Sequence, residues 1–174
     1  MKQSIETTFP QSKIGNCVET EQGDFQVFDS EIEPKRCHIK RYEEQPAHFK
    51  VLNANRKEVH FLAIDKCILY DDAKEHCDFA VFDDATFSFV EIKVRHPEHK
   101  RRNQDKKKAC RKLKETIAYF QEKGIDFQDI NLEAIICLTS EETHPVANSE
   151  SQNAVAEFLF SFNAKLLIGN KKGF

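Results

Sequence analysis

The sequence lacks the features that mark a membrane-spanning, secreted or multi-domain chain. No hydrophobic run approaches the length required to cross a bilayer, and the first residues, Met1–Glu6, contain no apolar signal core. No linker rich in Gly, Pro or Ser divides the 174 residues, which include only 5 Gly and 5 Pro. We therefore expect a cytoplasmic protein with no membrane partner and with a single domain that spans residues 1–174.

Cysteine pairs with the spacing of a metal site are also missing. The sequence has 6 cysteines, and no two of them form a Cys-x-x-Cys pair. Several fall in predicted strands, where a thiol behaves as a small hydrophobic side chain. We therefore expect reduced core residues rather than disulfides or a zinc site. The six are Cys17, Cys37, Cys67, Cys77, Cys110 and Cys137.

A large net charge is absent too, since the formal net charge is −3. This value argues against a protein that coats nucleic acid without specificity. The charges are nevertheless unevenly distributed. The segment from Lys100 to Lys114 is strongly basic and contains a single acid, Asp105. The sequence therefore predicts one positive surface on a molecule that is otherwise acidic.

The most informative stretch consists of two apolar segments, Cys77–Phe82 and Phe87–Val94, with a short polar break between them. Aromatic and β-branched residues in runs of this length predict a β-hairpin with a four-residue connection. Side chains two residues apart on a strand leave the same face, so Glu91 and Lys93 should lie together.

The register of this hairpin brings in a third charged residue. A four-residue loop pairs Asp78 with Glu91, and a shift of up to one residue pairs it with Ile92 or Lys93. Two carboxylates and one ammonium group then converge in strands that are apolar enough to be buried. Burial of ions is costly unless a partner or a metal compensates. Magnesium prefers oxygen ligands, which Asp78, Glu91 and the backbone carbonyl of Ile92 could supply.

This arrangement resembles the signature of the PD-(D/E)XK, or restriction-endonuclease-like, nuclease superfamily. That signature is an Asp at the start of one strand, followed by Glu-x-Lys in the next. The residues that carry the resemblance are Asp78 and Glu91-Ile92-Lys93. The resemblance implies that Asp78, Glu91 and Lys93 are catalytic, and that Asp78, Glu91 and Ile92 hold Mg²⁺, for which Mn²⁺ can substitute.

The tripeptide of an acid, any residue and Lys is not specific by itself, because it recurs elsewhere in the chain. Only Glu91-Ile92-Lys93 lies within an apolar strand that faces an aspartate across a hairpin. The alternative is a buried structural Glu–Lys pair with Asp78 at the strand entrance. Perturbed charges also occur in purely structural networks, so this alternative stays open.

Two other acids are candidates for an accessory role. Asp65 interrupts the apolar run Val59–Tyr70, so it either assists the site or pairs at the sheet surface with Lys66 or a neighbouring strand, the alternative that we prefer. In the resembling family a further acid often comes from a helix before the first core strand, which makes Glu58 a candidate. Residues 1–58 show no convincing helix and stay an unassigned N-terminal extension.

A long helix is predicted from about Arg102 to Glu122, with an apolar stripe at helical spacing and Gly124 as its C-terminal stop. A basic run of this kind is usually a solvated helix face. In the resembling family, however, the equivalent helix packs beside the active-site strands and offers a Gln or Lys to the phosphate. Phosphates are held chiefly by Lys and Arg, so we expect nucleic acid to bind here. The predicted nucleic-acid-binding residues are Arg101, Arg102, Lys108 and Lys112.

The rest of the chain completes an α/β order. Asn131–Thr139 reads as a buried strand parallel to a neighbour, Ala154–Phe162 as an amphipathic helix and Leu166–Ile168 as a short strand. With Val59–Tyr70 as the first strand, the order predicts a mixed central β-sheet flanked by helices. This α/β architecture matches the restriction-endonuclease-like core over about residues 59–139.

The expected function is therefore a magnesium-dependent nuclease, a hydrolase that cleaves phosphodiester bonds, with DNA favoured over RNA. The expected partner is nucleic acid, and a homodimer or a larger complex could supply specificity. Two alternatives stay open. One is a catalytically inactive nucleic-acid-binding or scaffold module of the same fold. The other is a protein-interaction module that uses the basic helix against an acidic partner.

Overall fold

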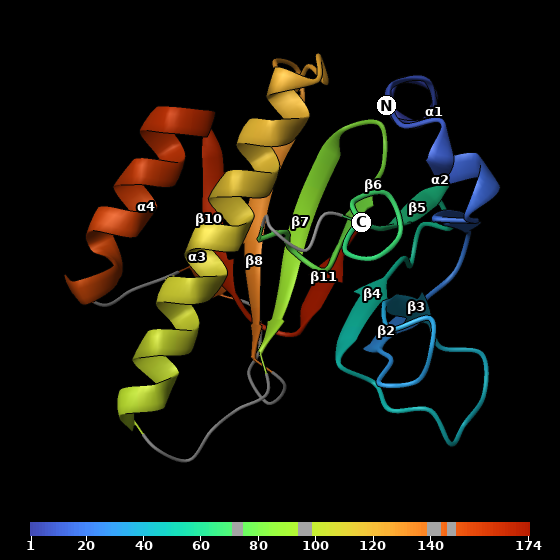
Figure 1. Cartoon of the computed structure of the whole chain (residues 1–174), viewed down its shortest axis with the longest axis horizontal. Coiled ribbons are helices and arrows are strands. Elements are labelled where there is room, and N and C mark those ends of the chain that lie inside the picture. The colour runs from blue at the N-terminus through green and yellow to red at the C-terminus, as the bar shows by residue number, and fades with distance from the viewer. Residues whose placement is uncertain (71–74, 94–98, 139–143, 146–148) are drawn as a thin grey trace.

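The computed structural model describes residues 1–70, 75–93, 99–138, 144–145 and 149–174, and within these ranges the side chains of 99–103, 144–145 and 149–151 are left out. Two mixed β-sheets and helices form the described part of the chain (Figure 1). The predicted α/β class is thus confirmed at this level. The helices are α1 (Lys2–Thr8), α2 (Gln11–Ile14), α3 (His99–Glu122) and α4 (Ser149–Phe162).

The large sheet has the strand order β1-β5-β6-β7-β8-β10-β9. Its strands β5, β6 and β7 form an antiparallel meander, and β8 lies parallel to its neighbour β7, as predicted. Strand β8 is also parallel to β10. The long helix α3 makes the crossover from β7 to β8. The strands are β1 (Val18–Glu21), β5 (Val59–Ala63), β6 (Phe79–Phe82), β7 (Thr86–Lys93), β8 (Asn131–Leu138), β9 (His144–Pro145) and β10 (Ala164–Ile168).

A small sheet with the order β11-β4-β2-β3 joins the N-terminal region to the end of the chain. Its strand β2 pairs antiparallel with β3 and β4, whereas β11 pairs parallel with β4. Sequence reasoning left residues 1–58 unassigned, and among these pairings only that of β11 with β4 joins segments far apart in the chain. The strands are β2 (Phe25–Asp29), β3 (Cys37–Ile39), β4 (Phe49–Leu52) and β11 (Lys171–Gly173).

The large sheet is covered on both faces, but by different structures. On one face, Phe120 of α3 meets Phe89 of β7 edge-on, with 5.1 Å between the ring centroids. On the other face, Phe49 of β4 contacts Phe79 of β6 with 5.5 Å between centroids. Figure 1 shows α3 and α4 on one side of the large sheet and the small sheet on the other. The flanking helices that the sequence predicted therefore cover one face, and a second sheet covers the opposite one.

The predicted strand Val59–Tyr70 is wrong in its second half, because β5 ends at Ala63. The chain then turns tightly, and the N–H groups of Ile68 and Leu69 both donate to the carbonyl of Ile64, at 3.2 and 3.1 Å. The apolar side chains of this turn are buried in the hydrophobic core although they do not lie on a strand. A mainly apolar run does not by itself distinguish a buried strand from a buried turn.

The expectation that all cysteines are reduced is also wrong. Cys17, just before β1, and Cys67, in the turn after β5, form a disulfide that joins residues 50 positions apart. Cys37, Cys77, Cys110 and Cys137 are free, and all but Cys110 are buried. The two paired cysteines are remote in sequence, so that only the pairing of β1 with β5 brings them together.

In the described part of the chain, no helix is long and apolar enough to cross a membrane.

Candidate functional site

The register of the central hairpin is the one that the sequence predicted. Phe79 pairs with Val90, so Asp78, one residue before β6, stands opposite Glu91. The backbone N–H of Ile92 donates to Asp78 Oδ2 at 2.6 Å, which fixes one oxygen of this carboxylate at the end of the hairpin. Glu91 lies on the sheet face beneath α3 and is fully buried. Strand period and hairpin register thus bring the two acids together.

Lys93 reaches back along β7 to its predicted partner. Its Nζ lies 2.7 Å from Glu91 Oε1, and its side chain is 17% exposed. A second lysine, Lys112 of α3, lies on the other side of the same carboxylate. Its Nζ is 2.9 Å from Glu91 Oε1, 3.2 Å from Glu91 Oε2 and 3.6 Å from Asp78 Oδ1. The structure therefore brings together Asp78, Glu91 and Lys93, and adds Lys112, which the sequence placed on the phosphate side of the site.

The side-chain hydroxyl of Thr116 ties helix α3 to the segment that carries Asp78. Thr116, one turn after Lys112, is buried, and its hydroxyl donates to the Lys112 carbonyl at 2.8 Å. The same hydroxyl accepts the backbone N–H of Cys77, also at 2.8 Å. Because Cys77 precedes Asp78, this single hydroxyl fixes the helix turn that carries Lys112 against the residue that carries the first acid.

Burial and the neighbouring charges shift the pKa values of the site residues. Burial, and then the charge of Asp78, raise the pKa of Glu91 to about 8, although Lys112 and Lys93 act in the opposite direction. Burial likewise raises the pKa of Asp78, against the lowering effects of Lys112 and of the Ile92 N–H. Burial lowers the pKa of Lys112, but Asp78 and Glu91 outweigh it and hold that pKa above its ordinary value. The two lysines thus compensate the acids only in part.

Asp78 also faces a pocket of about 550 Å³ between the small sheet and the turn after β5. Asp29, at the end of β2, and Asp65 line this pocket together with Asp78. Burial, followed by the charges of Asp65 and Glu91, raises the pKa of Asp29. The structure therefore places the accessory candidate Asp65 beside the site and adds Asp29. Sequence reasoning missed Asp29, since nothing local shows where β2 packs.

The other accessory candidate, Glu58, lies elsewhere. It is exposed and precedes Val59, which begins β5 and pairs with Glu21 of β1. Asp78 adjoins Phe79, which pairs with Ala63 at the opposite end of β5. The length of β5 therefore separates Glu58 from the two acids, and the structure gives it no place in the site.

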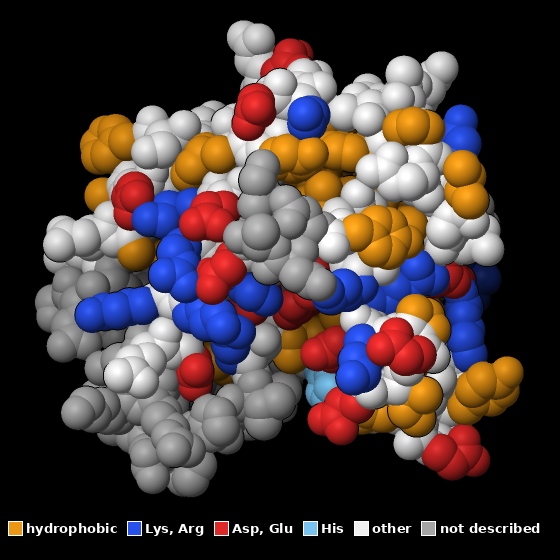
Figure 2. Space-filling view, viewed as in Figure 1, with side chains coloured by type: hydrophobic (Ala, Val, Ile, Leu, Met, Phe, Trp, Pro, Cys, Tyr) orange, Lys and Arg blue, Asp and Glu red, His pale blue; other side chains and the backbone are white. Residues whose placement is uncertain are grey.

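The basic surface over α3 is present but partly neutralised. Figure 2 shows Lys and Arg side chains gathered over α3 with acidic side chains among them. Lys108 is exposed, whereas Arg111 donates twice to Glu75, at 2.8 and 2.7 Å. The predicted contacts Arg101 and Arg102 lie in the first turn of α3, outside the described side chains.

The oxygen atoms of the site are chemically compatible with a hard cation. In the ranges that the structure describes, no group of three or more His, Cys, Asp and Glu side chains is placed to hold a metal ion. Magnesium, however, is usually bound through one or two carboxylates, with waters as the other ligands. Asp78 and Glu91 supply two carboxylates that already share one cationic group, the ammonium of Lys112. The carbonyl of Ile92 stays a predicted third ligand.

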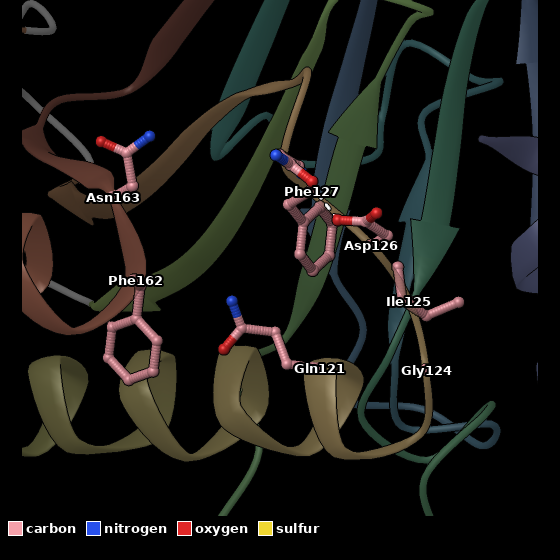
Figure 3. A pocket seen from close by; sticks show the side chains of 8 residues that line it. Gln121, Gly124, Ile125, Asp126, Phe127, Phe162 and Asn163 are labelled. Atoms are coloured by element: carbon pink, nitrogen blue, oxygen red, sulfur yellow. Dashed lines mark hydrogen bonds between the residues drawn. The ribbon is translucent and has the colours of Figure 1, made fainter.

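A second pocket, of about 510 Å³, lies at the other end of α3 (Figure 3). Gln121, Phe127 and Phe162 line it, and Asp126 is the acid among its lining residues. These residues surround the C-terminal end of α3, and Phe127 leads into the start of β8, whereas Glu91 and Lys93 lie at the end of β7. This pocket therefore has no part in the candidate site.

Comparison with known proteins gives no relative to argue from. The chain matches no protein-family model, no curated protein and no solved structure. A function for this chain therefore rests on the geometry of the site itself, with Asp78, Glu91, Lys93 and Lys112 at its centre.

Proposed function

We propose that this chain is a magnesium-dependent nuclease that hydrolyses phosphodiester bonds on a restriction-endonuclease-like core. The observation that carries the proposal is the arrangement of Asp78 and Glu91 about one shared cation, with Nζ of Lys112 3.6 Å from Asp78 Oδ1 and 2.9 Å from Glu91 Oε1. Two neighbouring carboxylates with raised pKa values repel each other, and a bound cation relieves that repulsion. A divalent metal ion meets this requirement better than one ammonium group.

The residues divide the work of the reaction among them. Asp78 and Glu91 would hold Mg²⁺, with the Ile92 carbonyl as the further ligand that the resemblance implies. When bound, the metal ion polarises the scissile phosphate and lowers the pKa of a bound water. Lys93 is anchored against Glu91 and still 17% exposed, so that its ammonium can reach a phosphate oxygen and offset the charge that develops there.

The basic residues of α3 favour a polyanionic substrate. The exposed Lys108 lies on the helix whose next turn carries Lys112 into the site. Phosphate groups are held mainly by such residues, and DNA is the substrate that we favour over RNA. A cytoplasmic location, and a homodimer or larger complex that supplies specificity, remain predictions.

The proposal is tested by Glu91→Gln, which keeps the size of the side chain and removes its charge. The assay measures cleavage of labelled single-stranded, duplex and branched DNA, and of RNA, in the presence of Mg²⁺, Mn²⁺ or EDTA. The variant should lose about 100-fold or more of the metal-dependent rate, while its circular dichroism spectrum is unchanged. Glu122→Gln, at the far end of α3, is the matched control and should cleave normally. Full activity in Glu91→Gln would remove the mechanism.

One observation favours a second candidate, a catalytically inactive nucleic-acid-binding or scaffold module. Glu91 is fully buried, and lysines contact both of its oxygens, as in a purely structural ion network. This module would bind DNA through α3 without any magnesium-dependent turnover. Tight binding in a filter assay, with no product in the presence of Mg²⁺ or Mn²⁺, would favour it over the nuclease.

A further inference from the structure

The proposed reaction assigns no step to Lys112, although this residue lies at the centre of the site. Its ammonium contacts both oxygens of Glu91, at 2.9 and 3.2 Å, and lies 3.6 Å from Asp78 Oδ1. Its side chain is 16% exposed, so most of it is withdrawn from solvent. Lys112 therefore contacts the same two carboxylates that would hold a metal ion.

An ammonium group and a divalent cation cannot both be held closely by these two carboxylates. Both require the same oxygen atoms, and like charges at short separation in a partly buried site repel strongly. Glu91 is fully buried, so its carboxylate cannot bind a second cation from the solvent side. Asp78 Oδ2 already accepts a hydrogen bond from the Ile92 N–H. Binding of one cation must therefore weaken the contacts of the other.

We propose that Lys112 is an internal competitor of the metal ion. This inference rests on the proposed function. In the metal-free protein the ammonium holds Asp78 and Glu91 together, and it leaves both carboxylates when a divalent cation binds. The helix does not need to move, because the Thr116 hydroxyl fixes the backbone of this turn to Cys77. Release of Lys112 is a rotation of one side chain towards solvent, which its 16% exposure permits.

Metal affinity measures this competition directly, without any activity assay. Lys112→Met keeps the aliphatic part of the side chain and removes the competing charge. We expect this variant to bind Mn²⁺ about tenfold more tightly than the unmodified protein, as measured from the free Mn²⁺ signal in electron paramagnetic resonance. Lys107→Met, an exposed position on the same helix, is the matched control and should bind Mn²⁺ with unchanged affinity. Equal or weaker binding by Lys112→Met would overturn the inference.

A second measurement uses the unmodified protein, in case Lys112→Met does not fold. Acetylation by an N-hydroxysuccinimide ester, quantified by mass spectrometry, reports how accessible each lysine is. We expect modification of Lys112 to be slow in EDTA and several times faster in Mg²⁺, while Lys107 reacts at the same rate in both. Modification of Lys112 that does not change with Mg²⁺ would contradict its release from the acids.

Failure of the competitor can be told apart from failure of the proposed function. Asp78→Asn removes one proposed ligand and should abolish Mn²⁺ binding. In one outcome, the unmodified protein binds Mn²⁺, Asp78→Asn does not, and Lys112→Met binds no more tightly than the unmodified protein. The metal site is then supported, and the inference that Lys112 competes with the metal ion is wrong. If the unmodified protein binds no Mn²⁺ that depends on Asp78, the proposed nuclease fails and the competitor fails with it.

Discussion

At the scale of single residues, Glu91 has surroundings that favour its neutral form. It is fully buried, and the pKa of its carboxyl is raised from an ordinary 4.5 to about 8, first by burial and then by Asp78. Lys93 and Lys112 reduce this shift without cancelling it. The pKa of Glu91 in the metal-free protein therefore lies above that of the same carboxyl group in the unfolded chain.

The first residue-scale prediction concerns how stability depends on pH. Between about pH 4.5 and 8 the native state holds more protons at Glu91 than the unfolded state does, so the free energy of unfolding falls as the pH rises. The loss through this one group approaches about 1.4 kcal/mol per pH unit at its steepest. Glu91→Gln cannot lose a proton, so its stability should fall less. Urea unfolding of both proteins in EDTA, from pH 5 to 8, measures the difference.

All other titrating groups are shared by the two proteins in this comparison, so the difference between their unfolding free energies isolates Glu91. That difference should move in favour of Glu91→Gln as the pH rises. A difference that stays constant from pH 5 to 8 would mean that Glu91 titrates outside this range.

The centre of the site follows from local rules, whereas its outer parts do not. Asp78, Glu91 and Lys93 meet because a strand has a period of two and a short loop fixes the hairpin register. Lys112 was expected near the site only because the family resemblance implies a Gln or Lys on this helix. Asp29 reaches the pocket only because the small sheet packs there, and no local pattern around β2 carries that information.

At the scale of elements, a buried polar cluster ties the small sheet to the large one. Lys172 of β11 lies 2.9 Å from Glu133 Oε2 of β8, and the hydroxyl of Ser88 on β7 donates to the same oxygen at 2.7 Å. Glu133 and Ser88 are buried, so this carboxylate depends on these two partners. The last strand of the chain is thereby fixed by charge as well as by its pairing with β4.

The element-scale prediction is that Lys172→Met destabilises the protein by about 3 kcal/mol, because it leaves a buried carboxylate without its cation. Chemical unfolding at pH 7 measures the loss. The double variant Lys172→Met with Glu133→Gln removes both charges and should recover most of it. If the double variant is no more stable than Lys172→Met alone, the loss comes from packing rather than from the unpaired charge.

Element types were predictable where a segment pairs with its neighbours in the chain. The hairpin β6–β7, the helix α3 and the strand β8 appear where the sequence predicted them. The prediction that the strand continues past Ala63 was wrong. A tight turn that buries Ile64 and Ile68 requires the same apolar residues as a buried strand. The pairing of β11 with β4 in the small sheet was not predicted, since these two strands are more than a hundred residues apart.

At the scale of the whole molecule, the disulfide between Cys17 and Cys67 joins the N-terminal region to the border of the candidate site. Cys67 lies two residues after Asp65, which lines the pocket at Asp78. The guanidinium of Arg36, in the segment that leads into β3, donates to the Gly15 carbonyl at 3.1 Å and also contacts Cys67 Sγ. The cross-link therefore lies where α2, the turn after β5 and the small sheet meet.

The final prediction concerns this cross-link. It closes a loop between residues 50 positions apart, so its removal should free the unfolded chain and cost about 2–4 kcal/mol of stability. Urea unfolding of Cys17→Ser with Cys67→Ser, without reductant, measures this cost. Dithiothreitol should lower the unmodified protein to nearly the same midpoint and leave the double variant unchanged. Cys110→Ser, which removes a free thiol on α3, should keep the full sensitivity to reductant. If dithiothreitol does not change the unfolding midpoint of the unmodified protein, Cys17 and Cys67 are unpaired in solution and this prediction is wrong.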